Sequence, residues 1–268
     1  MTDHKSGYAP VNGLHMYYEI HGTGDPLVLI HGSFSAIGTS FGELLPHLAE
    51  NRQVIAVEFQ GHGRTADIDR PLSPQLIAGD VAAVLDHLGI RQADVLGYSL
   101  GSTIAFQIAL TRPDLVRKLI LASFSFTAEG LHPGLSDGFE TLRPEHLIGS
   151  PFHDEYLRLA PRPEDFPALV DKISELMRTL RNPTADDVRA IQAPTMLVIG
   201  DSDIIRPEHA VETFRLRGGG VAGDQAGLPP ARLAVLPGTT HVTLVHRAEW
   251  LASMIDDFLA APEVKAED

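Results

Sequence analysis

A serine between two glycines is the most informative chemical feature of this sequence. The pentapeptide Gly97-Tyr98-Ser99-Leu100-Gly101 follows the predicted strand Asp94-Val95-Leu96 and precedes a helical segment that begins near Ser102. A sharp turn from strand to helix strains the backbone of its central residue and lifts that side chain clear of the sheet. The N–H groups at the start of the helix stabilise developing negative charge. The motif therefore predicts a nucleophile at Ser99, against the alternative of a glycine-rich turn that contains a serine by chance.

A serine nucleophile needs a base within hydrogen-bonding distance, and the base needs a group that orients it. Asp201 and Asp203 follow the predicted strand 195–199, at the edge of a parallel sheet where ligands bind. The residue period alone does not choose between these two aspartates. The candidate base is His241, which follows the predicted strand 233–236 and a predicted turn of small residues. The chain has 13 histidines, so a histidine alone is not informative, and His241 is chosen for its position. The nearby His246 is expected at the start of the last helix rather than in the loop.

Two backbone N–H groups are expected to hold the negative oxygen that forms when the nucleophile attacks. One belongs to Leu100, directly after the nucleophile, and the other belongs to Ser33, in the loop that follows the predicted strand 27–30. His31 could be taken for a second base, but we expect its ring to hold this loop in place. Phe34 and Tyr98 are predicted to contact the substrate.

The elements that position these residues alternate between strands and helices. Asn12-Gly13 predicts a hairpin turn between two opening strands, and Ser73-Pro74 predicts the start of a helix. Apolar runs without alternation are typical of strands buried on both faces. Residues 27–30 form such a run, and further strands are predicted at residues 54–57, 93–96, 119–122, 195–199 and 233–236. This order predicts an α/β fold, a mostly parallel twisted sheet with helices on both faces.

One long segment interrupts the alternation. Residues 125–192 contain no convincing strand, and an apolar stripe at helical spacing runs from Phe166 to Leu180. We interpret this segment as a small helical cap inserted into a core domain of residues 1–124 and 193–268; the alternative is an ordinary core helix. Met177 and Leu180 on the stripe are predicted to contact the substrate, because methionine adapts to an irregular pocket wall.

Composition limits the partners. With 21 Lys and Arg against 35 Asp and Glu, the net charge of −14 disfavours nucleic acid and gives no attraction to anionic lipid. The chain has no cysteine, which excludes disulfides, thiolate metal sites and a cysteine nucleophile. There is no apolar signal sequence and no run of about 18 apolar residues that could span a membrane. We therefore expect a cytoplasmic protein with a small-molecule substrate; its oligomeric state is not indicated.

Taken in order, five segments resemble the α/β-hydrolase fold family. They are His31-Gly32-Ser33, Gly61-His62-Gly63-Arg64-Thr65, Gly97-Tyr98-Ser99-Leu100-Gly101, Gly200-Asp201-Ser202-Asp203 with Pro207, and Gly238-Thr239-Thr240-His241. The resemblance covers nearly the whole chain except the predicted cap. In this family the acid usually lies three residues after the glycine that ends the strand and four before the proline. The resemblance therefore implies a catalytic triad of Ser99, Asp203 and His241, with Asp203 preferred over Asp201.

The resemblance narrows the reaction without settling it. Haloalkane dehalogenases and epoxide hydrolases of this fold use an aspartate where this chain has Ser99, and proline iminopeptidases carry a longer glycine-proline oxyanion loop. Carboxylesterases, lactonases, cofactor-free perhydrolases and carbon–carbon bond hydrolases remain. We predict a hydrolase of a small carboxylic ester or lactone that needs no metal or organic cofactor. The alternatives are a carbon–carbon bond hydrolase of a ketone, and a ligand-binding protein with a slow or vestigial triad.

Overall fold

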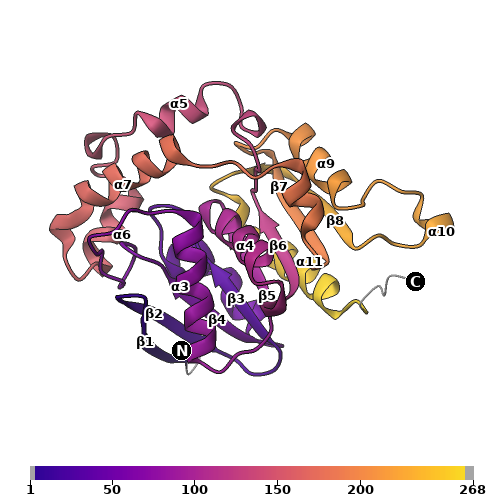
Figure 1. Ribbon diagram of the computed structural model, residues 1–268, viewed down its shortest axis with the longest axis horizontal. Coiled ribbons are helices and arrows are strands. Elements are labelled where there is room, and N and C mark those ends of the chain that lie inside the picture. The colour runs from indigo at the N-terminus through magenta and orange to yellow at the C-terminus, as the bar shows by residue number, and fades with distance from the viewer. Residues whose placement is uncertain (1–3, 263–268) are drawn as a thin grey trace.

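A single sheet of eight strands organises the protein. The computed structural model describes residues 4–262, so residues 1–3 and 263–268 of the predicted core domain lie outside it. The strand order is β1-β2-β4-β3-β5-β6-β7-β8 (Figure 1). β2 pairs antiparallel with β1 and with β4, and every other pairing is parallel, which confirms the predicted mostly parallel sheet. The strands are β1 (Lys5–Val11), β2 (Leu14–His21), β3 (Pro26–Ile30), β4 (Gln53–Glu58), β5 (Ala93–Tyr98), β6 (Val116–Ala122), β7 (Thr195–Ser202) and β8 (Ala231–Thr240).

Helices cover both faces of the sheet, as the alternating sequence pattern predicts. In β3, Val28 and Ile30 belong to one hydrophobic cluster and Leu27 and Leu29 to a second cluster on the opposite face. The first cluster packs against α3 and α4, and the second against α1, α2 and α11. The helices outside residues 125–192 are α1 (Ile37–Phe41), α2 (Leu44–Leu48), α3 (Pro74–His87), α4 (Leu100–Thr111), α9 (Pro207–Leu216), α10 (Gly223–Ala226) and α11 (Ala248–Ala260), with 3₁₀ turns η1 (Pro113–Leu115) and η5 (Leu244–His246).

Local sequence explains two of these elements. Asn12 and Gly13 have φ angles of 48° and 85°, the left-handed pair that a two-residue hairpin needs, and they join β1 to β2 as predicted. The side chain of Ser73 accepts a hydrogen bond from the N–H of Leu76, which caps the start of α3.

Residues 125–192 form helices and no named strand. They contain α5 (Leu135–Glu140), α6 (Pro151–Leu159), α7 (Phe166–Thr179) and α8 (Ala185–Ala190), with 3₁₀ turns η2 (Ala128–Gly130), η3 (Pro144–His146) and η4 (Pro163–Asp165). Helix α7 packs on α5 and α6, and Figure 1 shows these three helices together to one side of the sheet. Helix α8 packs on α9 instead. The division into core and cap domains stays a prediction.

Lys172 of α7 ties this segment to the loop that follows β4. Its Nζ donates to Asp67 Oδ2 at 2.7 Å and to the carbonyl oxygens of Ile68 and Arg70 at 2.7 and 2.9 Å. One ammonium group thus donates hydrogen bonds to three acceptors of this loop. Without Lys172, the two backbone carbonyl oxygens among them would need water as a hydrogen-bond donor.

The predicted turn before His241 is wrong. Strand β8 runs on through Pro237 and Gly238 to Thr240, with an irregular register opposite residues 200–202 of β7. Proline is tolerated because β8 is an edge strand, where a missing N–H breaks no ladder. Among residues 4–262, no helix is long and apolar enough to cross a membrane.

Candidate active site

Ser99 occupies a strained turn between β5 and α4. Its φ and ψ angles are 56° and −123°, a conformation that residues with a Cβ rarely adopt. The flanking glycines make the turn possible: a Cβ on Gly97 would clash with the carbonyl oxygen of Gly101, and a Cβ on Gly101 would clash with that of Ile30. Both glycines are therefore required by the close approach of backbone, and the turn raises the Ser99 hydroxyl above the sheet.

Ser99, His241 and Asp203 form a continuous chain of hydrogen bonds. The Oγ of Ser99 lies 3.0 Å from Nε2 of His241, and Nδ1 of His241 lies 3.0 Å from Oδ1 of Asp203. An ionised carboxylate only accepts hydrogen bonds, so Nδ1 carries the proton and Nε2 presents its lone pair to the serine hydroxyl. The Asp203 side chain is fully buried, whereas His241 is 17% exposed. The structure thus brings together the three residues that the sequence motifs single out.

Asp203 is held in its ionised form by several donors. Burial by itself raises its pKa, but hydrogen bonds from His241, from Ser123 and from the N–H of Gly200 outweigh burial and leave the pKa below its ordinary value. The hydroxyl of Ser123 donates to Oδ2 at 2.5 Å, and the N–H of Ile205 donates to Oδ1 at 3.3 Å. An ionised Asp203 keeps the imidazole in the tautomer that can accept a proton.

Asp201, the other candidate aspartate, binds backbone N–H groups and does not contact His241 in the hydrogen bonds of the described residues. Its carboxylate accepts hydrogen bonds from the N–H groups of Gly238 and Thr239 at 2.9 and 3.1 Å, and the residue is exposed. Asp201 thereby joins β7 to the end of β8, two residues before His241. His246 lies in η5, where it is exposed and contacts Glu43 at 3.1 Å.

Tyr98 supports the loop that carries the histidine. Its hydroxyl donates to the carbonyl oxygen of His241 at 2.8 Å, and the two rings stack with centroids 5.2 Å apart. The residue is 8% exposed. Its predicted contact with substrate stays a prediction beside this observed contact with His241.

The peptide between Gly32 and Ser33 has a fixed orientation beside Ser99. The carbonyl oxygen of Gly32 accepts hydrogen bonds from Nδ1 of His31 at 2.8 Å and from the hydroxyl of Ser35 at 3.0 Å. In a trans peptide the N–H points away from the carbonyl, so the Ser33 N–H is directed to the side opposite these donors. A Cβ on Gly32 would lie 3.2 Å from Cβ of Ser99, which shows how closely this loop approaches the serine.

The second backbone donor is at the start of α4. Leu100 is the first residue of this helix, directly after Ser99, and the first N–H groups of a helix have no partner within it. The helix dipole adds positive potential at this end. The N–H of Leu100 is therefore available to a negative oxygen formed at the serine.

His31 holds its loop as a neutral ring. Besides the hydrogen bond from Nδ1, its Nε2 accepts one from the N–H of Phe59 at 3.4 Å, so both nitrogens are satisfied without a second proton. Complete burial, together with the neighbouring His62, lowers the pKa of His31 well below its ordinary value. These contacts agree with the expected role of the ring in holding the oxyanion loop.

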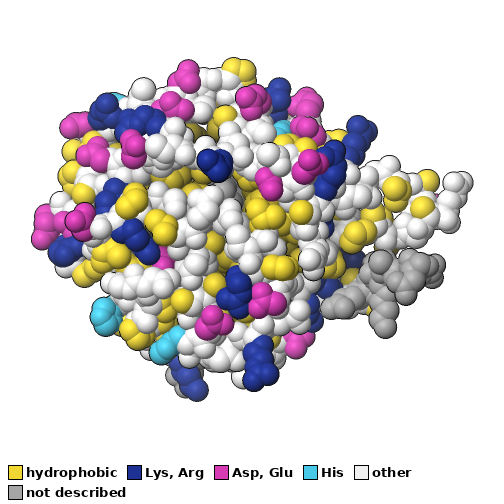
Figure 2. Space-filling view, in the orientation of Figure 1, with side chains coloured by type: hydrophobic (Ala, Val, Ile, Leu, Met, Phe, Trp, Pro, Cys, Tyr) yellow, Lys and Arg dark blue, Asp and Glu magenta, His cyan; other side chains and the backbone are white. Residues whose placement is uncertain are grey.

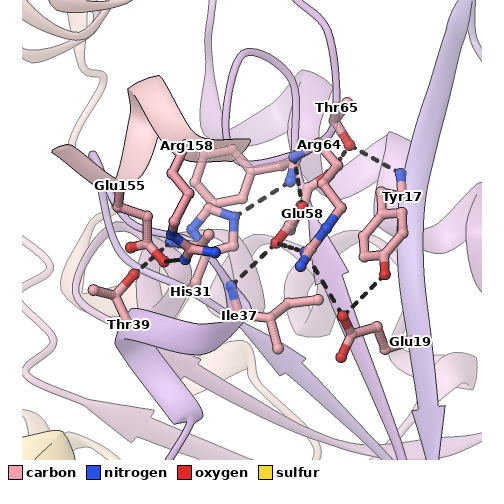
Figure 3. A network of polar contacts seen from close by, with 12 residues as sticks. Tyr17, Glu19, His31, Ile37, Thr39, Glu58, Arg64, Thr65, Glu155 and Arg158 are labelled. Atoms are coloured by element: carbon pink, nitrogen blue, oxygen red, sulfur yellow. Dashed lines mark hydrogen bonds and ion pairs between the residues drawn. The ribbon is translucent and has the colours of Figure 1, made fainter. Parts of the chain in front are cut away.

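A buried polar network lies between the segment after β3 and the loop after β4. Glu58 at the end of β4 accepts hydrogen bonds from the backbone N–H of Arg64 at 2.6 Å, from its guanidinium at 2.8 Å and from the N–H of Ile37 at 3.4 Å. Figure 3 shows Glu155 and Arg158 of α6 near His31 on the other side of this network. Burial raises the pKa of both Glu58 and Glu155. The network fixes the segment that follows the oxyanion loop.

Ser123 is the site residue that the sequence reasoning missed. It follows β6 directly, is 3% exposed and has a φ angle of 55°. The available signal was its position at the carboxyl end of a predicted strand, where the sheet binds ligands. A single serine carries no periodic pattern, so nothing else in the sequence marked it.

The other predicted substrate contacts lie on two segments. Phe34 is half-buried in the loop that follows β3, with a φ angle of 58°. Met177 is half-buried and packs against the core, and Leu180 lines a cavity of about 280 Å³ together with Leu176 and the chain that enters α3. Contact of Phe34, Met177 and Leu180 with substrate stays a prediction.

Comparisons with known proteins show the family to which the chain belongs. The family model described as the Alpha/beta hydrolase family matches residues 27–254, so the chain belongs to that family. The 2-hydroxymuconate semialdehyde hydrolase of Pseudomonas sp. (strain CF600) is 28% identical, over 91% of this chain and 90% of that protein. A pimeloyl-[acyl-carrier protein] methyl ester esterase of Neisseria meningitidis serogroup A is 30% identical, over 86% of this chain and 75% of that protein.

Solved structures show the same fold. The enol-lactonase from Burkholderia xenovorans LB400 superposes with a TM-score of 0.71 at 19% identity, over 95% of this chain and 100% of that chain. The meta-cleavage product hydrolase from Pseudomonas fluorescens IP01 superposes with a TM-score of 0.73 at 18% identity, over 95% of this chain and 97% of that one. At these identities the likeness concerns the fold.

Proposed function

We propose that this α/β hydrolase cleaves a small carboxylic ester or lactone through an acyl-enzyme intermediate. The hydrogen-bonded chain from Ser99 through His241 to Asp203, with 3.0 Å at each step, carries the proposal. It supplies a nucleophile, a base of the correct tautomer and an ionised orienting group, which together make up an acyl-transfer triad.

In this proposal His241 moves a proton twice. Nε2 takes the proton from the Ser99 hydroxyl as its oxygen attacks the substrate carbonyl, and the N–H groups of Ser33 and Leu100 donate to the negative oxygen that forms. Nε2 then gives the proton to the departing alkoxide. Water, activated by the same nitrogen, attacks the acyl carbon, and Ser99 is released with its proton restored.

The alignment with the methyl ester esterase of Neisseria meningitidis supports ester cleavage, because that relative aligns over 86% of this chain. A second candidate function is favoured by the alignment with 2-hydroxymuconate semialdehyde hydrolase over 91% of this chain. In that alternative the same triad would cleave a carbon–carbon bond next to a ketone. The two candidates differ in the leaving group, which is an alkoxide in the first and a carbanion equivalent in the second.

Activity profiling tests the proposal. Purified protein is incubated with a fluorophosphonate probe and assayed on aryl esters of graded acyl length, on lactones and on a coloured dienone. We expect labelling at Ser99, turnover of an ester or lactone, and loss of several orders of magnitude of kcat in Ser99→Ala, since a triad acts as a unit. Ser253→Ala removes an exposed serine of α11 and is the control. Turnover of the dienone alone would favour the second candidate, and labelling elsewhere would overturn both.

A further inference from the structure

Two histidines and a glutamate meet at the outer edge of the sheet, on β2 and beside β1. Within residues 4–262, His4, Glu19 and His21 form a group whose nitrogen and oxygen ligand atoms all lie within 4.8 Å of one another. The antiparallel register pairs Lys5 with Ile20, so His4 stands opposite His21 one step further along. Side chains alternate along a strand, so Glu19 shares the face of His21. The register of the hairpin thus builds the group.

The ligand atoms of the three side chains lie close together, and the ring of His4 has to leave its stack with His21 before the three can converge on one ion. Nε2 of His21 lies 2.9 Å from Oε2 of Glu19, and the rings of His4 and His21 stack with centroids 4.6 Å apart. Zinc–ligand distances of about 2.0–2.2 Å place two ligands of a tetrahedral ion roughly 3.4 Å apart. The His21–Glu19 pair therefore needs only a small separation, and the exposed His4 can turn toward it.

Glu19 is oriented by contacts on its other oxygen. The hydroxyl of Tyr17 donates to Oε1 at 3.0 Å, and the guanidinium of Arg64 lies 3.6 Å from the same atom (Figure 3). These partners leave Oε2 directed at His21. Hydrogen bonds of this kind orient metal-binding carboxylates. The positive charge of Arg64 near this group is balanced by Glu58, whose Oε1 lies 2.8 Å from the Arg64 guanidinium.

We propose that His4, Glu19 and His21 bind one divalent transition-metal ion of the zinc type, independently of the hydrolase site. Two imidazoles and a carboxylate suit such an ion and are a poor set for Mg²⁺, which prefers oxygen ligands and keeps its waters. The ion fastens the start of β1 to β2. Because β1 is an edge strand that pairs with β2 alone, this clip adds a link to a strand with a neighbour on one side only.

Zinc titration of tag-free, chelator-treated protein tests the site. Isothermal titration with ZnCl₂ should give one equivalent bound, and the melting temperature should rise with zinc but not with MgCl₂. His4→Ala should weaken zinc binding at least about tenfold without harming the fold, because His4 is exposed and only this ligand is lost. Tyr17→Phe keeps the ring and removes the hydroxyl from Glu19, and should weaken binding roughly 10–100-fold.

The matched control is His15→Ala. His15 is an exposed histidine of the same strand whose side chain does not belong to the group, so its loss should leave zinc affinity unchanged. The proposal is overturned if zinc shows no saturable binding of one equivalent, if His4→Ala binds zinc as the wild type does, or if His15→Ala loses binding to the same extent. None of these outcomes depends on hydrolase activity.

Discussion

Ser123 donates its hydroxyl to Oδ2 of Asp203 at 2.5 Å, while His241 contacts Oδ1 of the same carboxylate at 3.0 Å. The carboxylate of Asp203 is thus held from both sides. Ser123 reaches this position through a left-handed backbone, with φ at 55°, that costs a residue with a Cβ roughly 1–3 kcal/mol. A strained residue with a buried hydrogen bond to a charged site residue suggests that it serves the site at the expense of stability.

This relationship gives the first prediction. Ser123→Ala should reduce kcat/KM about 10–100-fold, since a hydrogen bond to a charged group contributes roughly 1.5–3 kcal/mol. The hydroxyl is one of the donors that lower the pKa of Asp203, so its removal weakens the hold on the ionised carboxylate. Ser123→Gly loses the same hydroxyl but relieves the backbone strain. It should match the alanine variant in activity and exceed it in melting temperature; equal activity of wild type and both variants would refute the role.

The second prediction compares the two aspartates. Asp203→Asn should reduce kcat on the order of 10⁴-fold, as in serine proteases, because the amide favours the wrong imidazole tautomer. Asp201→Asn should reduce kcat far less, because Asp201 contacts the N–H groups of Gly238 and Thr239. Steady-state kinetics on one ester decide the matter. If Asp201→Asn proves the more damaging, the triad has been assigned to the wrong acid.

The sequence predicted those parts of the fold in which several residues act together. Buried runs such as residues 27–30 identify central strands, and the glycines around Ser99 identify the turn, because in each pattern neighbouring residues meet the same structural requirement. The end of β8 was misassigned, because Pro237 and Gly238 are typical of turns and only the position of β8 at the sheet edge permits them in a strand. Ser123 was missed because its role depends on a contact across 80 residues of sequence.

The third prediction concerns the orientation of the oxyanion loop. Ser35→Ala removes one of the two donors to the Gly32 carbonyl oxygen and lets this peptide turn. We expect kcat to fall by up to about tenfold, less than the 10²–10³-fold that follows loss of an oxyanion donor itself. A trifluoromethyl ketone, which imitates the tetrahedral intermediate, should bind more weakly in parallel while KM changes little. Ser253→Ala is again the control. An increase in KM as large as the increase in the inhibitor's dissociation constant would argue against this mechanism.

The fourth prediction concerns acid stability. Burial lowers the pKa of His62 from 6.5 to about 4, and its Nδ1 lies 3.0 Å from the carbonyl oxygen of Gln60, which can only accept. Nε2 is buried without a hydrogen-bond partner, as expected for a ring that stays neutral. In the unfolded chain the ring binds a proton near pH 6.5. Stability from this residue is therefore complete above about pH 6.5 and falls as the pH drops toward about 4, by up to roughly 1.4 kcal/mol per pH unit.

His62→Asn tests this linkage, because the asparagine amide can still donate to Gln60 but does not titrate. Urea unfolding at several pH values should show a shallower loss of stability for this variant between about pH 6.5 and pH 4 than for the wild type. His132→Asn, which changes an exposed histidine, should follow the wild-type slope. Identical slopes for wild type and His62→Asn would show that His62 is protonated as easily in the folded as in the unfolded protein.

The last prediction concerns helix α7 and the residues that follow it. Leu169 is 2% exposed and lies against Gly61 of the loop after β4, whereas Met177 and Leu180 are only half-buried. Leu169→Ala should therefore lower stability by about 2–5 kcal/mol, as expected when a packed leucine is truncated. Met177→Ala and Leu180→Ala should cost less stability and change the preference for acyl length, since one methylene in a pocket shifts selectivity by roughly 1–3 kcal/mol.

The measurements are melting temperatures and kcat/KM values for a series of ester chain lengths, with Leu169→Ala as the matched control for packing. Leu180 gives the sharper comparison, because it lines the cavity of about 280 Å³ next to the start of α3. If Met177→Ala and Leu180→Ala instead lose as much stability as Leu169→Ala and keep the wild-type chain-length profile, α7 serves packing alone and the predicted cap does not select the substrate.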